Sequence, residues 1–287
     1  MLQIQWENEM NFYKTENLQA TLKLRNDVNA IILAGGTDLM VKYRNPTLIL
    51  PNIEKDILYI GHLKELKGIA ITKGKIRIGA VSTLNELEEN DITPPILKKA
   101  IKELASLSIR NIATIGGNIA NASPAGDTIS PLIAIDATII LKSIKGERKL
   151  PIAKFIFGPG KTVLEENEII EAIEINDSKF NREYYKKVGT RHANALSKIN
   201  FVGLALIEND SLMDIKIAIG AVAPVVVRSE QIEKKLKGMK LKEIKKTIND
   251  IQKEYSSLIN PIDDQRSTAI YRKNIALNLL KNFLQSL

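Results

Sequence analysis

The pattern of apolar and polar residues divides the chain into a mixed first part and a second part in which strands precede helices. In the first part, brief runs of Ile, Leu and Val are separated by turns that contain Gly, Pro, Asn or Asp. This spacing is typical of short buried strands. We expect a first strand, a turn and a short helix near Leu18–Leu24 within residues 1–27. The further predicted strands are Ile31–Leu33, Leu48–Leu50, Ile57–Ile60, Gly68–Thr72, Lys75–Ala80, Ala137–Lys142 and Ile169–Ile175.

Apolar residues at helical spacing, together with start signals, predict short helices between these strands. Thr83 and Glu86 have the spacing of a capping box. The pair Pro94-Pro95 opens a helix, because proline suits the first helical turn, whereas Pro131 is expected to interrupt one. The predicted helices are Asp38–Arg44, Thr83–Glu89, Ile96–Leu107, Ala125–Ile135 and Leu150–Phe157.

The polar segment Asn176–Phe180 has no clear periodicity, and we expect a domain boundary there. Strands then precede helices, an order typical of α+β folds. The predicted architecture is a two-lobed domain over residues 1–176, with subdomains of about 1–53 and 54–176, followed by a smaller α+β domain over residues 181–287. The second domain is predicted to hold a short antiparallel sheet (Glu183–Val188, Ile199–Ile207, Leu212–Ala223) and helices at Ser229–Leu236, Leu241–Glu254 and Ser267–Leu287.

Two pairs of adjacent glycines, Gly35-Gly36 and Gly116-Gly117, interrupt apolar runs. Paired glycines pack nothing in a strand, but they let successive backbone N–H groups converge on an anion. The first pair lies between a predicted strand and a predicted helix, with Thr37 or Asp38 as N-cap, and helix N-termini favour phosphate. We therefore expect two glycine loops that present N–H groups to one extended ligand with two phosphates.

Polar side chains surround the second pair, but neither pair belongs to a standard nucleotide-binding motif. Neither pair matches G-x-G-x-x-G or the P-loop pattern, which disfavours a nicotinamide Rossmann domain and a P-loop nucleotidase. Asp127 is either a ligand contact or the N-cap of the helix that follows it. The polar residues around the second pair are Asn111, Thr114, Asn118, Asn121, Ser123 and Asp127.

The composition is that of a globular protein, with 44% hydrophobic and 26% charged residues in 287. The chain has no cysteine, which excludes disulfides, a thiol nucleophile and a cysteine-ligated zinc site or iron–sulfur cluster within it. Its two histidines cannot form a His-rich metal site. No apolar run is long enough for a membrane span and no signal peptide pattern is visible, so a cytoplasmic location is expected.

The net charge of +8 comes largely from a lysine-rich helical stretch at residues 232–253. Solvated helix faces explain it better than a nucleic-acid site, because no aromatic residues interleave the lysines and no recognition motif is present. A basic binding module nevertheless stays an alternative, and it predicts salt-sensitive binding to DNA or RNA.

Several motifs, in order, resemble those of the FAD-binding medium subunits of molybdenum hydroxylases of the xanthine, carbon monoxide and nicotinate dehydrogenase types. The first two are A-G-G-T-D-L from Ala34 and R-N-I-A-T-I-G-G-N-I-A-N-A-S-P-A-G-D from Arg110. Segments at 184–202, 220–230 and 263–272 resemble the C-terminal domain of that family, the last with a slight shift at its serine. The resemblance thus covers most of the chain.

This resemblance implies FAD as the cofactor, and neither a catalytic nor a metal-binding residue on this chain. Asp127 would accept hydrogen bonds from ribityl hydroxyls. Ile170, within Leu164–Ile170, would contact the adenine or the isoalloxazine. Lys187 would approach the flavin ring, with Lys186 as the alternative. The remaining contacts implied are Leu33, Ala34, Gly35, Gly36, Thr37, Asp38, Thr114, Ile115, Gly116, Gly117, Asn118 and Ser123.

The implied function is electron transfer within a multi-subunit oxidoreductase. Substrate would react at a molybdenum cofactor on a large partner subunit, and electrons would pass through two-iron two-sulfur clusters on a small partner subunit. FAD would then deliver them to NAD or another acceptor. A self-sufficient FAD-dependent oxidoreductase of the same fold is the alternative, but the residues show no acid–base pair that it would need.

Overall fold

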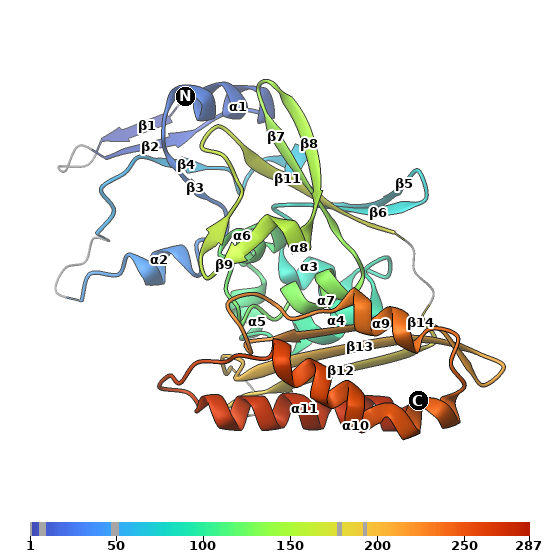
Figure 1. Ribbon diagram of the computed structural model, residues 1–287. Helices are drawn as coiled ribbons and strands as arrows, with labels where there is room; N and C mark the ends of the chain where they lie inside the picture. The colour runs from blue at the N-terminus through green and yellow to red at the C-terminus, as the bar shows by residue number, and fades with distance from the viewer. Residues whose placement is uncertain (1, 6–9, 47–51, 177–179, 192–193) are drawn as a thin grey trace.

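The computed structural model of the chain describes residues 2–5, 10–46, 52–176, 180–191 and 194–287. The strands in these ranges form four sheets, and most of the short helices lie between the N-terminal and C-terminal sheets (Figure 1). The predicted α+β class is confirmed by this mixture of helices and sheets. The predicted strand Leu48–Leu50 and part of the expected boundary at Asn176–Phe180 lie outside the described residues.

The N-terminal sheet has the order β1-β2-β4-β3 and places the first glycine pair at one of its edges. Strand β4 runs parallel to both β2 and β3. The chain leaves β3 at its carboxyl end, passes through Gly35-Gly36 and enters the short helix α2. The elements are β1 (Leu2–Gln5), β2 (Asn11–Lys14), α1 (Leu18–Asp27), β3 (Ile31–Leu33), α2 (Leu39–Lys42) and β4 (Ile57–Tyr59).

The middle sheet is antiparallel throughout, with the order β5-β6-β11-β7-β8. Lys73 and Gly74, both with positive φ, form the tight turn of its first hairpin, as the sequence predicts. The strands are β5 (Ile69–Thr72), β6 (Lys75–Gly79), β7 (Thr138–Ser143), β8 (Gly146–Pro151) and β11 (Ile169–Asn176), and a small pair is formed by β9 (Ile156–Gly158) and β10 (Lys161–Thr162).

Helices around this sheet differ from the prediction in several places. The helix predicted at Leu150–Phe157 covers only Ile152–Phe155, because Leu150 and Pro151 end β8 and Ile156 and Phe157 begin β9. The helix expected to reach Leu107 ends at Lys102, because Ala105 takes a left-handed φ of 46°. Pro131 does not interrupt its helix, since it lies in the first turn, where its missing N–H is not needed. The second glycine pair lies inside a helix rather than a loop. The helices are η1 (Lys64–Leu66), α3 (Leu84–Glu89), α4 (Pro95–Lys102), α5 (Leu107–Arg110), α6 (Ile115–Ala120), α7 (Ile129–Ala134) and α8 (Ile152–Phe155).

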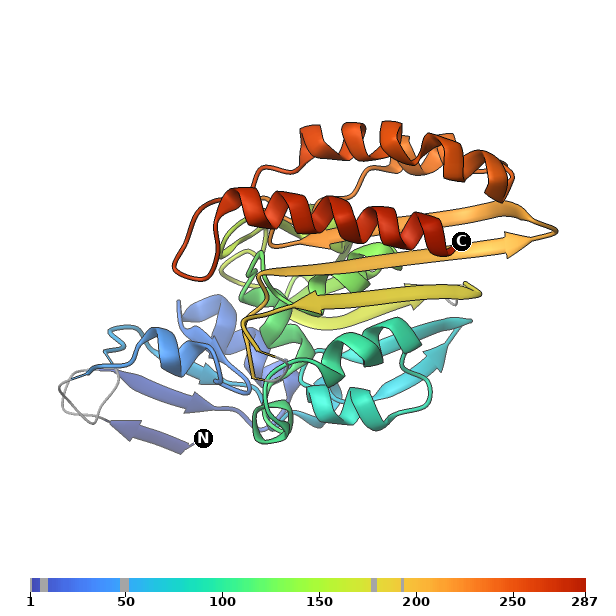
Figure 2. The ribbon, with the colours of Figure 1, turned by 90° about the horizontal axis from the view of Figure 1, so that it is seen from below.

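The C-terminal part is a three-stranded antiparallel sheet covered on its outer face by α10 and α11 (Figure 2). Phe283 of α11 packs against Gly203, where an added Cβ would lie 2.6 Å from the ring. Helix α7 packs on β13 and β14, so the sheet is buried on both faces. The elements are β12 (Arg182–Val188), β13 (Ile199–Glu208), β14 (Ser211–Gly220), α9 (Glu230–Leu236), α10 (Leu241–Leu258) and α11 (Ala269–Ser286). Within the described part of the chain, no helix is long and apolar enough to cross a membrane.

The two glycine motifs are packed directly against each other. A Cβ on Gly35 would lie 2.1 Å from the backbone oxygen of Ile112 and 3.1 Å from the Cα of Ala113. Gly35 is therefore required for close packing of two backbone segments. The contact joins the N-terminal sheet to the segment that leads into α6.

We predict that Gly35→Ala lowers the free energy of unfolding by about 1–3 kcal/mol, because the added methyl forces rigid backbone apart. Gly158→Ala is the matched control, since a Cβ there meets only the side chain of Lys161, at 3.6 Å. Urea denaturation of both variants is the measurement. Equal stability of the two variants would show that the contact at Gly35 is not tight.

Candidate functional site

The first glycine turn presents a row of unused backbone donors. Gly36 takes a left-handed φ of 72°, which turns the chain from β3 into α2. The N–H groups of residues 35–39 donate no hydrogen bond to any described residue, although the N–H of Met40 bonds the oxygen of Gly36 at 2.9 Å. Successive free N–H groups beside a helix N-terminus form a nest suited to an anion.

The second glycine motif is built differently, and here the expectation of free N–H groups is wrong. Thr114 caps α6, and its hydroxyl oxygen accepts from the N–H of Gly117 at 3.1 Å. The N–H of Ile115 bonds Ser82 O, that of Gly116 bonds Ala80 O at 2.8 Å, and that of Asn118 bonds Thr114 O. A Cβ on Gly116 would lie 2.7 Å from Ala80. The second pair therefore allows close packing and lines the site without offering an anion nest.

A cleft of about 240 Å³ brings the two motifs together. The side-chain amide of Asn121 donates to the Asp38 carboxylate at 2.9 Å and ties one wall to the other. Asn118 accepts from the Thr128 hydroxyl at 2.6 Å, which leaves its amide nitrogen available as a donor. The cleft is lined by Leu33, Ala34, Gly35, Gly36, Thr37, Asp38, Leu39, Lys42, Ala113, Thr114, Gly117, Asn118, Ala120, Asn121 and Gly160.

Lys42 is the lining residue that the sequence analysis missed and that matters most for an anion. It lies one turn beyond the nest on α2, with its side chain exposed. The sequence did offer a signal for this residue. Lys42 lies four residues after Asp38, the N-cap of a helix that starts at a glycine turn. Gly160 was not predictable, because it reaches the cleft through a hydrogen bond from its N–H to Ala122 O that only the fold creates.

An apolar pocket of about 60 Å³ adjoins the cleft and shares Ala34, Gly117 and Ala120 with it. Ile170 and Leu164 line this pocket, as do Ile32, Ile60, Ala80, Val81, Gly116 and Ile169. Ile115, by contrast, is fully buried in the core, so its side chain does not face the cleft. The pocket can take the edge of an apolar ring system next to the anion nest.

Asp127 and Lys187 form a buried ion pair, which the sequence did not predict. Lys187 Nζ lies 2.7 Å from Asp127 Oδ2, and the two side chains are 7% and 8% exposed. The Ser197 hydroxyl donates to Asp127 Oδ1 at 2.5 Å, and Lys187 Nζ also donates to Glu103 O at 2.8 Å. Burial raises the pKa of the Asp127 carboxyl, while Lys187 and Ser197 counteract that rise. Lys186 is exposed to solvent, so of the two lysines only Lys187 points inward.

Neither Asp127 nor Ser123 lines the glycine cleft. The N-cap of α7 is Thr128, so Asp127 does not cap that helix. Ser123 lies at the edge of a second cleft of about 400 Å³, between α8 and the segment that follows β14. Lys187 opens onto a third, polar cleft with Glu103 and Arg191. The predicted site residues therefore line several clefts rather than one pocket.

We predict that Lys187→Met lowers the free energy of unfolding at neutral pH by about 3–5 kcal/mol, because it leaves a buried carboxylate without its cation. Without Lys187 the pKa of Asp127 rises further. Stability of this variant should therefore increase as the pH falls from that raised value toward the ordinary value of about 3.9.

The controls are Lys186→Met, which alters an exposed lysine, and the double variant Lys187→Met/Asp127→Asn, which should recover much of the loss and show no acid gain. Urea titrations at several pH values make the comparison. A single variant as stable as the double variant would contradict a buried pair.

The chain matches known protein families over both of its parts. Residues 8–176 match the FAD binding domain in molybdopterin dehydrogenase, and residues 183–287 match the CO dehydrogenase flavoprotein C-terminal domain. The glyceraldehyde dehydrogenase medium chain of Sulfolobus acidocaldarius is 34% identical over 274 residues, which cover 93% of this chain and 94% of that protein. The xanthine dehydrogenase FAD-binding subunit of Escherichia coli O157:H7 is 28% identical, over 91% and 89%.

Solved structures agree with these sequence matches. A chain of carbon monoxide dehydrogenase from Hydrogenophaga pseudoflava superimposes with a TM-score of 0.86 at 25% identity, and the match covers 98% of this chain and 96% of that one. The resemblance inferred from the motifs is thereby confirmed over residues 8–176 and 183–287. The chain belongs to the family of FAD-binding medium subunits of the molybdenum hydroxylases.

Proposed function

We propose that the N–H nest of residues 35–39 holds the pyrophosphate of FAD in this chain. The observation that carries the proposal is the row of N–H groups without an acceptor among the described residues. Buried or half-buried backbone donors are almost always satisfied, so an unused row at a helix start calls for an anionic ligand. The ammonium of Lys42 adds a positive charge at the same wall.

Other residues of the cleft fit the rest of the cofactor. The hydroxyls of Thr37 and Thr114 can donate to phosphate oxygens, and the free amide of Asn118 suits phosphate or ribityl oxygens. Ile170 would contact one of the two ring systems through the adjoining apolar pocket. FAD, when bound, supplies the redox chemistry.

Lys187 would provide positive charge near the isoalloxazine, and Asp127 would hold that ammonium in place while its oxygens accept from ribityl hydroxyls. A fixed ammonium in a site of low dielectric stabilises negative charge far better than one in water. The Asp127–Lys187 pair supports this role because its geometry leaves the lysine a single orientation between Asp127 and Glu103 O.

We further propose that the chain is the electron-transfer subunit of a complex. A sequence without cysteine offers no ligands for an ordinary iron–sulfur cluster. A small partner subunit would therefore carry two-iron two-sulfur clusters, and a large partner subunit would carry the molybdenum cofactor and the substrate. NAD or another oxidant would receive the electrons. The names of the relatives, medium chain and FAD-binding subunit, each describe one chain of several.

Flavin binding tests the first proposal. The purified chain should bind one FAD and bind riboflavin, which lacks the pyrophosphate, far more weakly. Lys42→Met should weaken FAD binding several-fold and make it less sensitive to salt, because an exposed ammonium acts mainly through screened electrostatics.

Lys145→Met is the matched control, since Lys145 is also exposed but lies in the β7–β8 hairpin, outside the cleft. Fluorescence titration of each flavin measures the affinities. Equal binding of riboflavin and FAD would contradict a pyrophosphate nest.

Copurification tests the second proposal. Affinity purification of the tagged chain from its native host should recover two further subunits, with iron, molybdenum and FAD in the same fraction. Elemental analysis and flavin release are the measurements. A flavin-loaded chain that oxidises a small substrate alone, with no partner and no metal, would instead favour the self-sufficient oxidoreductase.

A further inference from the structure

Helix α7 and the residues beside it are held to the C-terminal sheet at successive points. At the first point, Asp127, two residues before the helix, binds Lys187 of β12 at 2.7 Å. At the second, the Ser130 hydroxyl donates to the side-chain oxygen of Asn200 on β13 at 2.5 Å, and both residues are fully buried. The segment before the helix therefore contacts β12, and the helix itself contacts β13.

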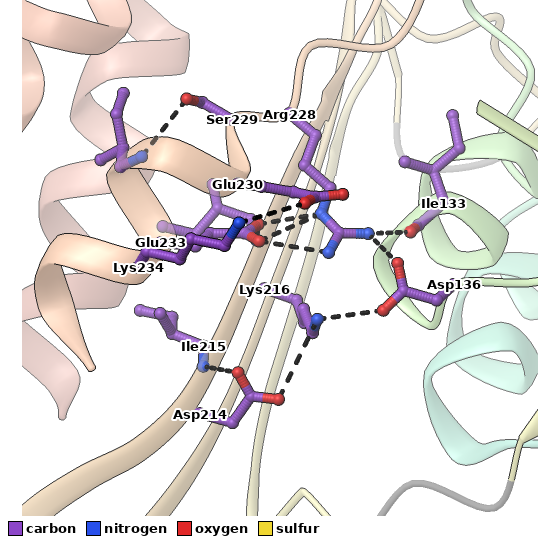
Figure 3. Close-up of polar contacts among 12 residues, drawn as sticks. Ile133, Asp136, Asp214, Ile215, Lys216, Arg228, Ser229, Glu230, Glu233 and Lys234 are labelled. Atoms are coloured by element: carbon purple, nitrogen blue, oxygen red, sulfur yellow. Dashed lines mark hydrogen bonds and ion pairs between the residues drawn. The ribbon is translucent and has the colours of Figure 1, made fainter. Parts of the chain in front are cut away.

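The third point is a charge cluster centred on Arg228, at the other end of α7 (Figure 3). Arg228 Nη1 donates to Ile133 O and to Asp136 Oδ1, each at 2.6 Å. Its Nε lies 3.0 Å from Glu233 Oε1, and Lys216 of β14 reaches the other oxygen of Asp136 at 3.0 Å. One guanidinium thus joins the carboxyl end of α7 to α9.

The cluster is enclosed on the Glu233 side and open to solvent at Asp136. The side chains of Arg228 and Glu233 are 10% and 3% exposed, whereas that of Asp136 is 49% exposed. Lys216 also lies 4.0 Å from the carboxylate of Asp214. Burial raises the pKa of Glu233. For Asp136, the hydrogen bonds from Arg228 and Lys216 outweigh burial and lower its pKa. The planar fork of arginine is what allows several acceptors to be satisfied together, and lysine cannot reproduce it.

Arg228 lies outside the glycine cleft and lines the second cleft, between α8 and the segment after β14. Its contacts nevertheless bear on the cofactor site through a short rigid element. Asp127 lies two residues before the six-residue helix α7, and Asp136 lies two residues after it. A packed helix moves as a unit, so a change at one of its ends shifts the other.

We propose that Arg228 is a positioning residue: by fixing the carboxyl end of α7 on the C-terminal sheet, it sets where Asp127 holds Lys187 relative to the flavin. This inference rests on the proposed binding of FAD. It assigns a cofactor-tuning role to a residue that touches neither the cleft nor the ion pair. The coupling passes through Ile133 O and Asp136, not through the sheet alone.

The test compares Arg228→Met, Arg228→Lys and a core variant, Leu284→Ala, which lowers stability from a fully buried position on α11. All are studied well below their melting temperatures. Arg228→Met should weaken FAD binding by at least about fivefold, as coupled sites do. It should also make the midpoint potential of the bound flavin more negative, because Lys187 no longer stabilises the reduced ring. Arg228→Lys should recover part of both effects, and Leu284→Ala should change neither.

If Arg228→Met does not fold, Asp136→Asn, which weakens the same contacts, carries the test. Wild-type-like affinity and potential in the Arg228 or Asp136 variants would overturn the proposal. Hydrogen exchange of residues 127–136 tests the docking role of Arg228 independently of FAD binding. Faster exchange there in the variants supports the docking role even if the wild-type chain binds no FAD, and unchanged exchange contradicts it.

Discussion

The fold of this chain depends on one tight contact between two backbone segments, where Gly35 rests on the peptide of Ile112 and Ala113. No side chain fits between them. Because the contact fixes the first glycine turn, the N–H groups that follow it face the cleft and not the core. The first glycine turn packs against the second motif. The N–H groups of the second motif donate to Ser82, Ala80 and Thr114. The two glycine motifs therefore have different roles: the first offers free N–H groups, and the second allows close packing.

A second constraint is the polar seam between α7 and the C-terminal sheet. Polar groups are paired there: Asp127 with Lys187 and Ser130 with Asn200, both buried, and the half-exposed Asp136 with Arg228. Pairs of this kind add little net stability but are costly to break, so they favour one register of helix on sheet over others. Under the proposed function this register matters, because Lys187 comes from the sheet and the glycine cleft comes from the other part of the chain.

The sequence was informative about elements and cofactor family, and less so about long-range geometry. The Lys73-Gly74 hairpin and the capping box of Thr83 and Glu86 follow from local rules, and the structure reproduces them. The end of α4 at Lys102 was missed, because nothing in the local pattern shows that Ala105 adopts a left-handed backbone. The pairing of Asp127 with Lys187 joins residues 60 positions apart. It could not be predicted without the fold, which brings the segment before α7 next to β12. Likewise, a Gly-Gly pair does not reveal whether its N–H groups are free, since that depends on Ser82 and Ala80 in another segment.

Residue-resolved amide hydrogen exchange, with and without FAD, distinguishes the roles of the two glycine motifs. Residues 35–39 should exchange rapidly in the free chain and be strongly slowed by FAD. Gly116 and Gly117, already hydrogen-bonded within the chain, should be protected in both states. Slowing confined to residues 115–118, with no change at residues 35–39, would contradict the division of labour between the two glycine motifs.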